Sequence, residues 1–359
     1  MNWVVHKFGG ASVKDAGAVR NLGQILMDRS TGDDADRQVA VVVSAMGKTT
    51  NALEAVWGAL PHAASSSAVI DPVMAAHRAT VQGLGLPQTT LDADFAAFEV
   101  LAESWRGRPQ SDEGYDAIVG QGERWSTRIV AAHLAAIGLP ALWVSAWDVV
   151  ETDGRHRSAG VDVVRLQRNV SQARDGWVGH IPVLQGFVGA TAEGRPTTLG
   201  REGSDFSGAL LAEALGAERF FVWKDVPGVM TGDPRHWPPA QCLDRLDHST
   251  ADILGRAGAG VLHRDTVAPL RRAGIPLHVR SFLDPLAPGT CIDGDTPSND
   301  LPPLWTHSVA VDGIRQVRCI GAGESEAKRM WLAHFPETTI RSIGPDPHFP
   351  GTTLILIGA

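Results

Sequence analysis

The sequence predicts an α/β protein with a mostly parallel central sheet covered by helices on both faces, followed by a small ferredoxin-like unit. Apolar, β-branched runs such as Gln38–Val43 alternate with longer segments of helical periodicity from the N-terminus onward. This alternation is typical of parallel strands that are joined by helices and buried on both sides. Residues 304–359 instead hold short strand patterns around one helical pattern.

The elements of the larger part are expected in this order. Strands are expected at 4–8, 38–43, 142–144, 181–184, 220–223 and 276–281, and helices at 50–60, 63–79, 91–105, 204–215, 249–256 and 265–272. One long helix is expected from Ser111 to Gly138, where the glycine supplies the C-cap. A hairpin-like excursion is expected at 223–235, because its Pro-Gly and Asp-Pro pairs mark turns.

The chain is expected to divide into two domains. Proline, glycine and aspartate dominate 284–303, which predicts a linker. We therefore place one domain at 1–293 and an incomplete, ferredoxin-like one at 304–359. In the second domain, strands are expected at 309–311, 316–320, 338–343 and 352–357, and a helix at 325–334.

Composition and charge argue against several classes of function. Of the 359 residues 43% are hydrophobic and 20% are charged, which is ordinary globular material. A net charge of −8 without a basic block argues against nucleic-acid binding, and no stretch of roughly 18 apolar residues predicts a membrane span. Three widely spaced cysteines, and a first strand without a preceding signal peptide, indicate the cytoplasm. The 13 histidines lack metal-ligand spacing, so no metal site is expected.

A glycine-rich turn follows the first expected strand. Lys7 is followed by Gly9 and Gly10 and then by Ser12, just ahead of a helical segment. Glycines let another group approach the backbone closely, and a helix N-terminus offers free N–H groups and a positive dipole end. With the lysine, the turn suits an anion, most simply a phosphate. A tight turn with a solvated lysine explains the stretch equally well.

Two further loops combine hydroxyl, glycine and charged side chains. The segment 44–51 places Thr50 at a helix start, where this region can hold a carboxylate or phosphate or simply cap the helix. In the segment 197–209, Arg201 can grip a carboxylate in a bidentate manner. Asp205 can pair with the lysine of the first turn or serve as an N-cap.

Charged side chains also stand at two other turns. Lys224 and Arg235 can meet nucleotide phosphates and Met230 can lie near a base, although a polar hairpin explains their segment as well. Glu123 stands at a helix start, where a carboxylate favours the dipole. It can also accept the ammonium group of an amino-acid substrate.

In this order, the segments KFGGAS, SAMGKTTN, GERWS, TTLGREGSD and WKDVPGVMTGDPR resemble the motifs of aspartate kinases, in the amino acid kinase superfamily. The resemblance covers roughly residues 1–293. Other members of the superfamily share the fold and a lysine near the first loop, but not GERWS together with TTLGREGSD. The resemblance implies a three-layer αβα amino acid kinase fold. It also implies ATP-dependent phosphorylation of the L-aspartate β-carboxylate to 4-phospho-L-aspartate, with ATP and Mg²⁺.

The resemblance implies roles for individual residues. Lys7 matches the catalytic lysine that bridges the phosphoryl group in transfer, and Asp205 matches the aspartate that orients this lysine. Aspartate-binding positions are matched by Thr50, Glu123, Arg201, Glu202, Gly203 and Ser204. ATP-binding positions are matched by Lys7, Gly9, Gly10, Ser12, Lys224, Asp225, Met230, Arg235, Gly260 and Val261.

The sequence departs from the family's pattern at two nucleotide-binding positions and in its C-terminal region. Gly260 stands where a nucleotide-contacting lysine is usual, and Lys224 stands where threonine is common, so Lys224 can supply the missing charge. Family members commonly carry two ACT regulatory domains after the kinase domain. Residues 304–359 can hold at most one incomplete ACT-like unit, so weak or absent feedback control is expected.

Three functions remain open on the sequence. We favour an aspartate kinase at the first step of the pathway to lysine, threonine and methionine. The alternatives are a related carboxylate kinase for another acceptor, and a non-catalytic homologue that binds an amino acid or a nucleotide. Gly260 favours the last alternative, whereas Lys7, Arg201 and Asp205 together argue against it. The expected partners are L-aspartate, ATP and a second copy of the chain in a homodimer.

Overall fold

The computed structural model describes residues 2–200, 203–257, 265–294, 301–307, 314–349 and 351–358. The chain divides into two compact units, Met1–Asp225 and Val226–Ala359. This division falls ahead of the linker that the sequence predicts at 284–303, and the domain boundary at 293–304 remains a proposal.

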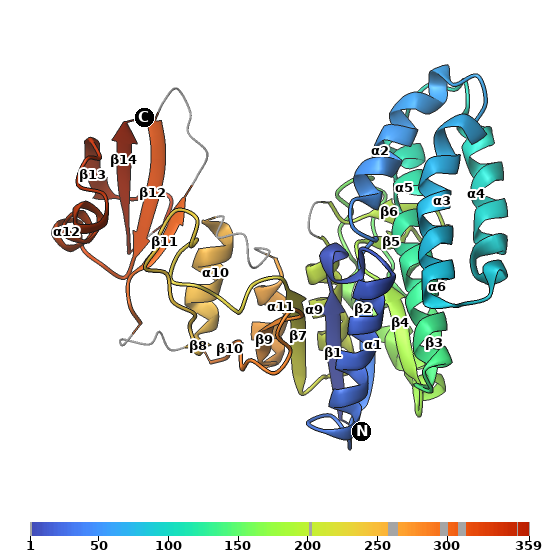
Figure 1. The fold of residues 1–359 in the computed structure, drawn as a ribbon, viewed down its shortest axis with the longest axis horizontal. Helices are drawn as coiled ribbons and strands as arrows, with labels where there is room; N and C mark the ends of the chain where they lie inside the picture. The colour runs from blue at the N-terminus through green and yellow to red at the C-terminus, as the bar shows by residue number, and fades with distance from the viewer. Residues whose placement is uncertain are drawn as a thin grey trace. The chain divides into compact units, whose positions relative to one another are not determined.

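Parallel strands form the sheet of the first unit (Figure 1). They are β1 (Trp3–Phe8), β2 (Gln38–Val43), β3 (Ala141–Val144), β4 (Ile181–Gln185) and β7 (Arg219–Lys224). Their spatial order is β3-β4-β2-β1-β7, and each neighbouring pair is parallel. Every residue of β1 is buried, as expected for a strand that is covered on both faces.

Helices cover both faces of this sheet, which confirms the three-layer arrangement (Figure 1). The longer helices are α1 (Ala16–Thr31), α2 (Thr49–Ala59), α3 (Ser67–Leu84), α4 (Asp92–Trp105), α6 (Gln121–Ala136), α8 (Val163–Ala173) and α9 (Gly203–Leu215). Shorter ones are α5 (Asp112–Val119), α7 (Ala146–Val149) and the 3₁₀ turns η1 (Gly10–Val13), η2 (Leu60–His62), η3 (Gln88–Leu91) and η4 (Arg174–Trp177). On one face α9 packs on β1, β2 and β7 with α8 beside it, and on the other α6 packs on β2, β3 and β4 with α1 and α3 against it.

The helix expected from Ser111 to Gly138 is in fact two helices, so that prediction was wrong. α5 and α6 meet at Gly120. A Cβ at Gly120 would lie 3.1 Å from Val188 Cγ1, so the residue allows a close approach of strand β5 (Val188–Ala190). The apolar periodicity of the sequence continues through Gly120. The break between the two helices follows from a tertiary contact, which periodicity does not reveal. β5 forms an antiparallel hairpin with β6 (Pro196–Thr198).

The strands of the second unit pair in two groups. In one group the order is β9-β10-β8, from β8 (Arg245–Leu246), β9 (Leu277–Ser281) and β10 (Thr290–Ile292), with α10 (His248–Arg256) and α11 (Val267–Ala273) nearby in the chain. The other is antiparallel, in the order β11-β12-β14-β13, from β11 (Leu304–His307), β12 (Ile314–Ile320), β13 (Ile340–Pro345) and β14 (Thr352–Gly358), with α12 (Glu324–His334). This small antiparallel sheet with its helix agrees with the predicted ACT-like unit. The strand expected at 309–311 lies outside the described residues.

Three tryptophan side chains pack the C-terminal sheet and its helix against the segment that follows β7. Trp305 on β11 and Trp331 on α12 are buried against Trp237, with ring centroids 4.6 and 6.0 Å from that of Trp237. The backbone N–H of Trp305 also donates to the Thr231 carbonyl oxygen at 2.7 Å. A complete ferredoxin-like unit has two helices, whereas α12 is the one helix in the described part of 301–358. Trp237 contributes to the core of this unit from outside its sheet and helix.

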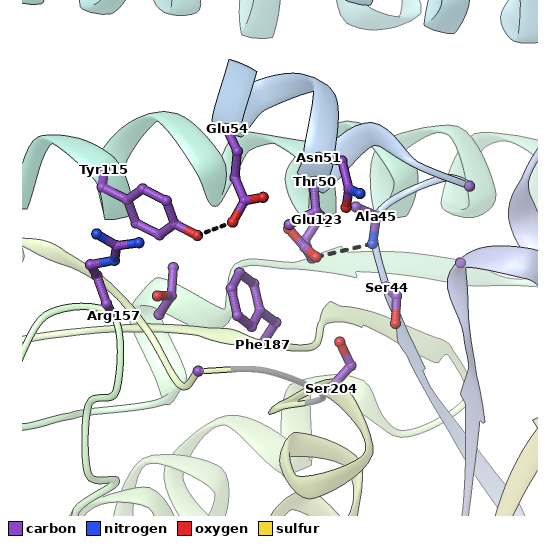
Figure 2. A pocket seen from close by; sticks show the side chains of 14 residues that line it. Ser44, Ala45, Thr50, Asn51, Glu54, Tyr115, Glu123, Arg157, Phe187 and Ser204 are labelled. Carbon is purple, nitrogen blue, oxygen red and sulfur yellow. Dashed lines mark hydrogen bonds between the residues drawn. The ribbon is translucent and has the colours of Figure 1, made fainter. Parts of the chain in front are cut away.

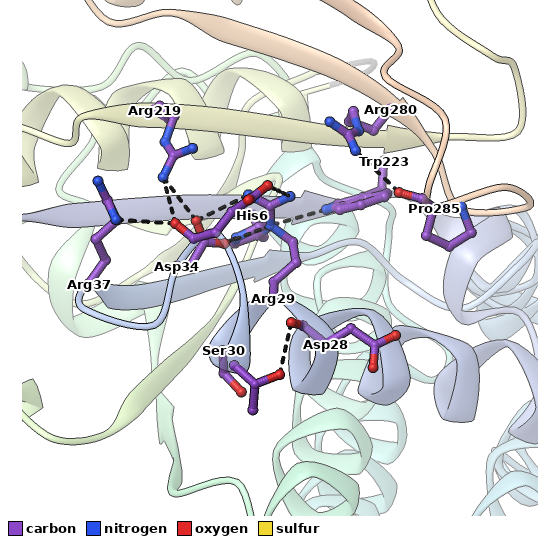
Figure 3. A network of polar contacts seen from close by, with 12 residues as sticks. His6, Asp28, Arg29, Ser30, Asp34, Arg37, Arg219, Trp223, Arg280 and Pro285 are labelled. Atoms are coloured by element: carbon purple, nitrogen blue, oxygen red, sulfur yellow. Dashed lines mark hydrogen bonds and ion pairs between the residues drawn. The ribbon is translucent and has the colours of Figure 1, made fainter.

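A buried polar network joins β1, β7 and the connection from α1 to β2 (Figure 3). Trp223 Nε1 donates to His6 Nδ1 at 3.1 Å, so His6 Nε2 carries a hydrogen and donates to Asp34 Oδ2 at 3.2 Å. Burial lowers the pKa of His6 and keeps the ring neutral. Burial alone would raise the pKa of Asp34, but the hydrogen bonds from His6 and Arg29 hold it well below its usual range.

No helix in the described ranges combines the length and the apolar character that a membrane crossing requires.

Candidate active site

Loops at the carboxyl ends of the parallel strands enclose a cavity of about 570 Å³ (Figure 2). Gly10, Ser44 and Phe187 line it just beyond β1, β2 and β4, and Thr50 and Ser204 line it from the first turns of α2 and α9. This edge of an open α/β sheet is where ligands usually bind. The sequence-predicted residues Gly10, Thr50, Glu123 and Ser204 therefore share one cavity.

The glycine turn after β1 packs directly on the loop after β2. A Cβ at Gly10 would lie 2.8 Å from the Ala45 carbonyl oxygen, and the Gly47 N–H donates to the Gly10 carbonyl oxygen at 2.9 Å. Ser12 closes the turn, because its hydroxyl donates to the Gly9 carbonyl oxygen at 2.6 Å. Gly10 thus serves the close backbone approach that the sequence indicates, whereas a Cβ at Gly9 would meet no backbone atom of the described residues within 4 Å.

Lys7, Asp205 and Lys224 form one charged cluster. The Lys7 ammonium group contacts Asp205 Oδ1, and Lys224 Nζ lies 2.7 Å from Asp205 Oδ2. Lys7 and Asp205 are 5% and 3% exposed, whereas Lys224 reaches the surface. Burial alone would raise the pKa of Asp205, but the two lysines outweigh it and lower the pKa to about 2. Asp205 is therefore ionised and fixes both ammonium groups.

Glu123 presents a buried carboxyl group to the cavity from the first turn of α6 (Figure 2). Its Oε1 accepts a hydrogen bond from the Ala45 N–H at 3.1 Å. Its Oε2 is buried and has no hydrogen-bond partner in the ranges that the structure describes. Burial raises the pKa of Glu123 to about 8, although Lys7 acts in the opposite direction. The side chain can therefore accept a hydrogen bond from a donor group or contact a cation.

Several lining residues were missed by the sequence reasoning, among them Glu54, Tyr115 and Arg157. The Tyr115 hydroxyl donates to Glu54 Oε1 at 2.5 Å, and the Arg157 guanidinium lies 4.0 Å from the centroid of the Tyr115 ring (Figure 2). All three face the cavity. Tyr115 is the single tyrosine of the chain, but nothing in its local pattern separates it from a core aromatic. Arg157 belongs to a loop that the sequence reading left unassigned.

The other predicted site residues divide into three groups. Gly203 opens α9 beside Ser204, and Asp225 ends the first unit. Met230 and Arg235 belong to the second unit, where the Arg235 side chain is 84% exposed and lies 2.7 Å from Asp233, so their place in a nucleotide site stays a prediction. Arg201, Glu202, Gly260 and Val261 lie outside the described residues.

Comparison with known proteins agrees with this geometry. The model of the amino acid kinase family matches residues 2–281. Lysine-sensitive aspartokinase 3 of Escherichia coli is 34% identical over 310 residues, which cover 84% of this chain and 66% of that protein. A bifunctional aspartokinase/homoserine dehydrogenase of Zea mays is 30% identical over 89% of this chain, which spans only 36% of the plant protein.

A solved structure has the same architecture. E. coli aspartokinase III in complex with aspartate and ADP has a TM-score of 0.76 and 27% identity, covering 100% of this chain and 79% of that one. The family match extends over more than three quarters of the residues and includes every loop of the cavity. The chain belongs to the amino acid kinase family.

Proposed function

We propose that the protein is an aspartate kinase, which transfers the γ-phosphoryl group of ATP to the β-carboxylate of L-aspartate and forms 4-phospho-L-aspartate. The observation that carries this proposal is the lone buried oxygen of Glu123, which faces a cavity next to the Lys7–Asp205–Lys224 cluster. An amino-acid ammonium group satisfies that oxygen, and the cationic cluster suits an acidic acceptor beside phosphates. The similarity to aspartokinases supports the same substrate.

The residue types match the demands of this reaction. A β-carboxylate is ionised at neutral pH, so the nucleophile needs no general base. The obstacle is the approach of one anion to a polyanion, which positioned cations and N–H donors relieve. In this proposal Lys7 spreads the charge of the phosphoryl group, and Asp205 holds Lys7 in place. Glu123 receives the substrate ammonium group, and Arg201 grips a substrate carboxylate.

Magnesium is proposed to enter with ATP as the substrate complex. The described residues contain no group of three or more acidic, histidine or cysteine side chains placed to hold a metal ion, and Asp205 is already engaged by two ammonium groups. Mg²⁺ commonly binds through substrate phosphates with few protein ligands. The protein's own part is therefore the placement of Lys7 and of the backbone N–H groups after β1.

Product assays with different acids separate the open functions. ADP release is measured with ATP and, in turn, aspartate, glutamate or acetylglutamate, and hydroxylamine traps any acyl phosphate formed. Turnover with aspartate alone supports the proposal. Turnover with another acid supports a related carboxylate kinase, and binding without turnover of any acid supports a non-catalytic homologue. In the active enzyme, Arg201→Ala raises the KM for aspartate. An unchanged KM overturns the assignment of Arg201.

Weak or absent feedback control is part of this proposal. The C-terminal sheet carries one helix among its described residues, and its core is filled by tryptophan side chains. Lysine and threonine are therefore expected to leave the turnover of aspartate unchanged. A homodimer and a cytoplasmic location remain predictions, which sedimentation and cell fractionation test directly.

A further inference from the structure

One buried carboxylate behind the cavity wall is used by none of the roles proposed so far. Asp116 on α5 is fully buried. Its Oδ1 accepts from the Thr198 hydroxyl at 2.6 Å, and its Oδ2 accepts from His156 Nδ1 at 2.9 Å. The backbone N–H of Arg157 donates to the same group, 3.0 Å from Oδ2. Asp116 thus joins an α-helix, the end of strand β6 and the loop of Arg157.

The loop of Arg157 has a strained backbone conformation that contacts with Asp116 stabilise. Arg157 has φ +66°, in the left-handed region that is strained for a residue other than glycine. The Asp116 carboxylate binds the N–H of this strained residue. A charge-assisted bond to a buried carboxylate is among the stronger hydrogen bonds in proteins, so it offsets the strain.

The same loop forms the support for the turn that leads to Arg201. Gly200 has φ +83°, and a Cβ there would lie 3.3 Å from the Arg157 carbonyl oxygen. The Ala159 N–H donates to the Thr198 carbonyl oxygen at 2.9 Å, which fixes the loop to β6 a second time. Arg157, Thr198 and Gly200 all line the cavity, whereas Asp116 does not line it and binds Arg157 and Thr198.

We propose that Asp116 is a positioning residue for the acceptor side of the active site, where it fixes the Arg157 loop and the Thr198–Gly200 turn as one wall. This inference rests on the proposed kinase function and assigns the residue that shapes the acceptor pocket. The wall is built from residues beyond β6 and around Arg157, whereas the glycine turn after β1 donates none of the hydrogen bonds that Asp116 accepts from His156, Arg157 and Thr198. Loss of the carboxylate therefore disturbs acceptor binding more than ATP binding.

Asp116→Asn tests this role, because it is expected to change the KM for aspartate more than kcat or the KM for ATP. The amide cannot accept from all three donors, so the KM for aspartate rises about tenfold, while kcat stays within about threefold and the KM for ATP within about twofold. Thr198→Val removes one of the three donors with little change of shape, and gives a smaller rise in the same constant. Equal changes in both KM values, or no change in that for aspartate, overturn the proposal.

Asp94→Asn is the matched control. Asp94 is also a buried helix carboxylate, with Arg124 Nε at 2.6 Å and Arg128 Nε at 3.4 Å, but it does not line the cavity or contact the Arg157 loop. This variant loses a comparable ion pair and keeps the KM for aspartate of the wild type. A rise equal to that of Asp116→Asn means that any buried carboxylate has this effect, and it overturns the proposal.

Amide hydrogen exchange gives a readout that needs no substrate. In Asp116→Asn the amides of 155–160 exchange about tenfold faster or more than in the wild type, while those of α3 and α4 do not change. Unchanged exchange at 155–160 overturns the positioning role. A wild type that phosphorylates no aspartate instead refutes the proposed function, and the exchange result then decides the role of Asp116 independently.

Discussion

Lys7 and Lys224 contact opposite oxygens of one carboxylate, that of Asp205. Lys7 comes from β1 and Lys224 from the end of the neighbouring strand β7, where the parallel register sets Lys7 opposite Val222. Two ammonium groups so placed repel each other unless an anion lies between them. Asp205 therefore allows two ammonium groups to lie close together around one buried carboxylate.

Asp205→Asn is expected to lower kcat about a hundredfold or more, because the buried lysine loses the carboxylate that orients it. Steady-state assays measure this loss. Circular dichroism checks that the fold is kept.

Lys224→Met is the comparison for that variant, because it removes one ammonium group and leaves the Lys7–Asp205 pair. We expect a fall in kcat of about tenfold, smaller than that of Asp205→Asn. If Asp205→Asn keeps kcat within about threefold of the wild type, the carboxylate does not organise the cluster, and this interpretation fails.

The pKa of Glu123 predicts how aspartate binding depends on pH. Below its raised pKa of about 8 the carboxyl is protonated, and it must release that proton to pair with an ammonium group. The KM for aspartate is therefore expected to fall as the pH rises from 6 to 8, by up to about tenfold per unit, and then to level off. Initial rates at varied aspartate and saturating ATP measure this dependence.

Glu123→Gln removes the titrating group and keeps the shape of the side chain. Its KM for aspartate is expected to be high and nearly independent of pH over the same range. The wild-type carboxyl also lowers the free energy of unfolding as the pH rises from about 4.5 to about 8, because the unfolded chain loses the proton first. A pH-independent KM in the wild type excludes Glu123 as the ammonium acceptor.

Local pattern in the sequence was enough for the parallel strands of the first unit, most helices and the glycine turn, but it missed the short strands β5, β6, β8, β10 and β11. Gly10 was predictable because a strand, two glycines and a helix start follow one another directly, and the structure places its backbone against the next loop. Asp116 and Arg157 were not predictable, because their contact joins segments 41 residues apart through a backbone N–H. Such a contact depends on the conformation of a loop, and a loop produces no periodic pattern in the sequence.

Asp34→Asn is expected to lower the free energy of unfolding by about 3–5 kcal/mol, because it leaves the buried His6 and Arg29 without their carboxylate. The Asp34 carboxylate contributes this stability above pH 3.8, and the contribution is lost as the pH falls further, since the folded pKa lies below the unfolded one. Urea unfolding at pH 7 measures the difference.

Asp33→Asn is the matched control for that change. Asp33 also contacts Arg29, at 3.5 Å, but its side chain is 70% exposed. Exposed pairs contribute about 0–1 kcal/mol, so this variant is expected to unfold near the wild-type midpoint. Equal losses in the two variants would mean that burial of the network in Figure 3 adds nothing.

Gly10→Ala and Gly9→Ala separate close packing from the general flexibility of the turn after β1. An alanine Cβ at position 10 meets the carbonyl oxygens of Ala45 at 2.8 Å and Gly47 at 3.1 Å, and backbone atoms cannot swing aside. We expect a loss of about 1–3 kcal/mol in stability, as for other overpacked sites. The loop after β2 must also shift, so kcat/KM falls.

At Gly9 the nearest atom to an added Cβ is Lys7 Nζ, at 3.6 Å, and the backbone is extended with φ −79°. Alanine adopts that conformation without strain, so Gly9→Ala is expected to keep the free energy of unfolding within about 0.5 kcal/mol. Thermal unfolding of both variants gives the comparison. Equal destabilisation at the two positions would mean that flexibility of the turn, and not its contact with the loop after β2, requires glycine.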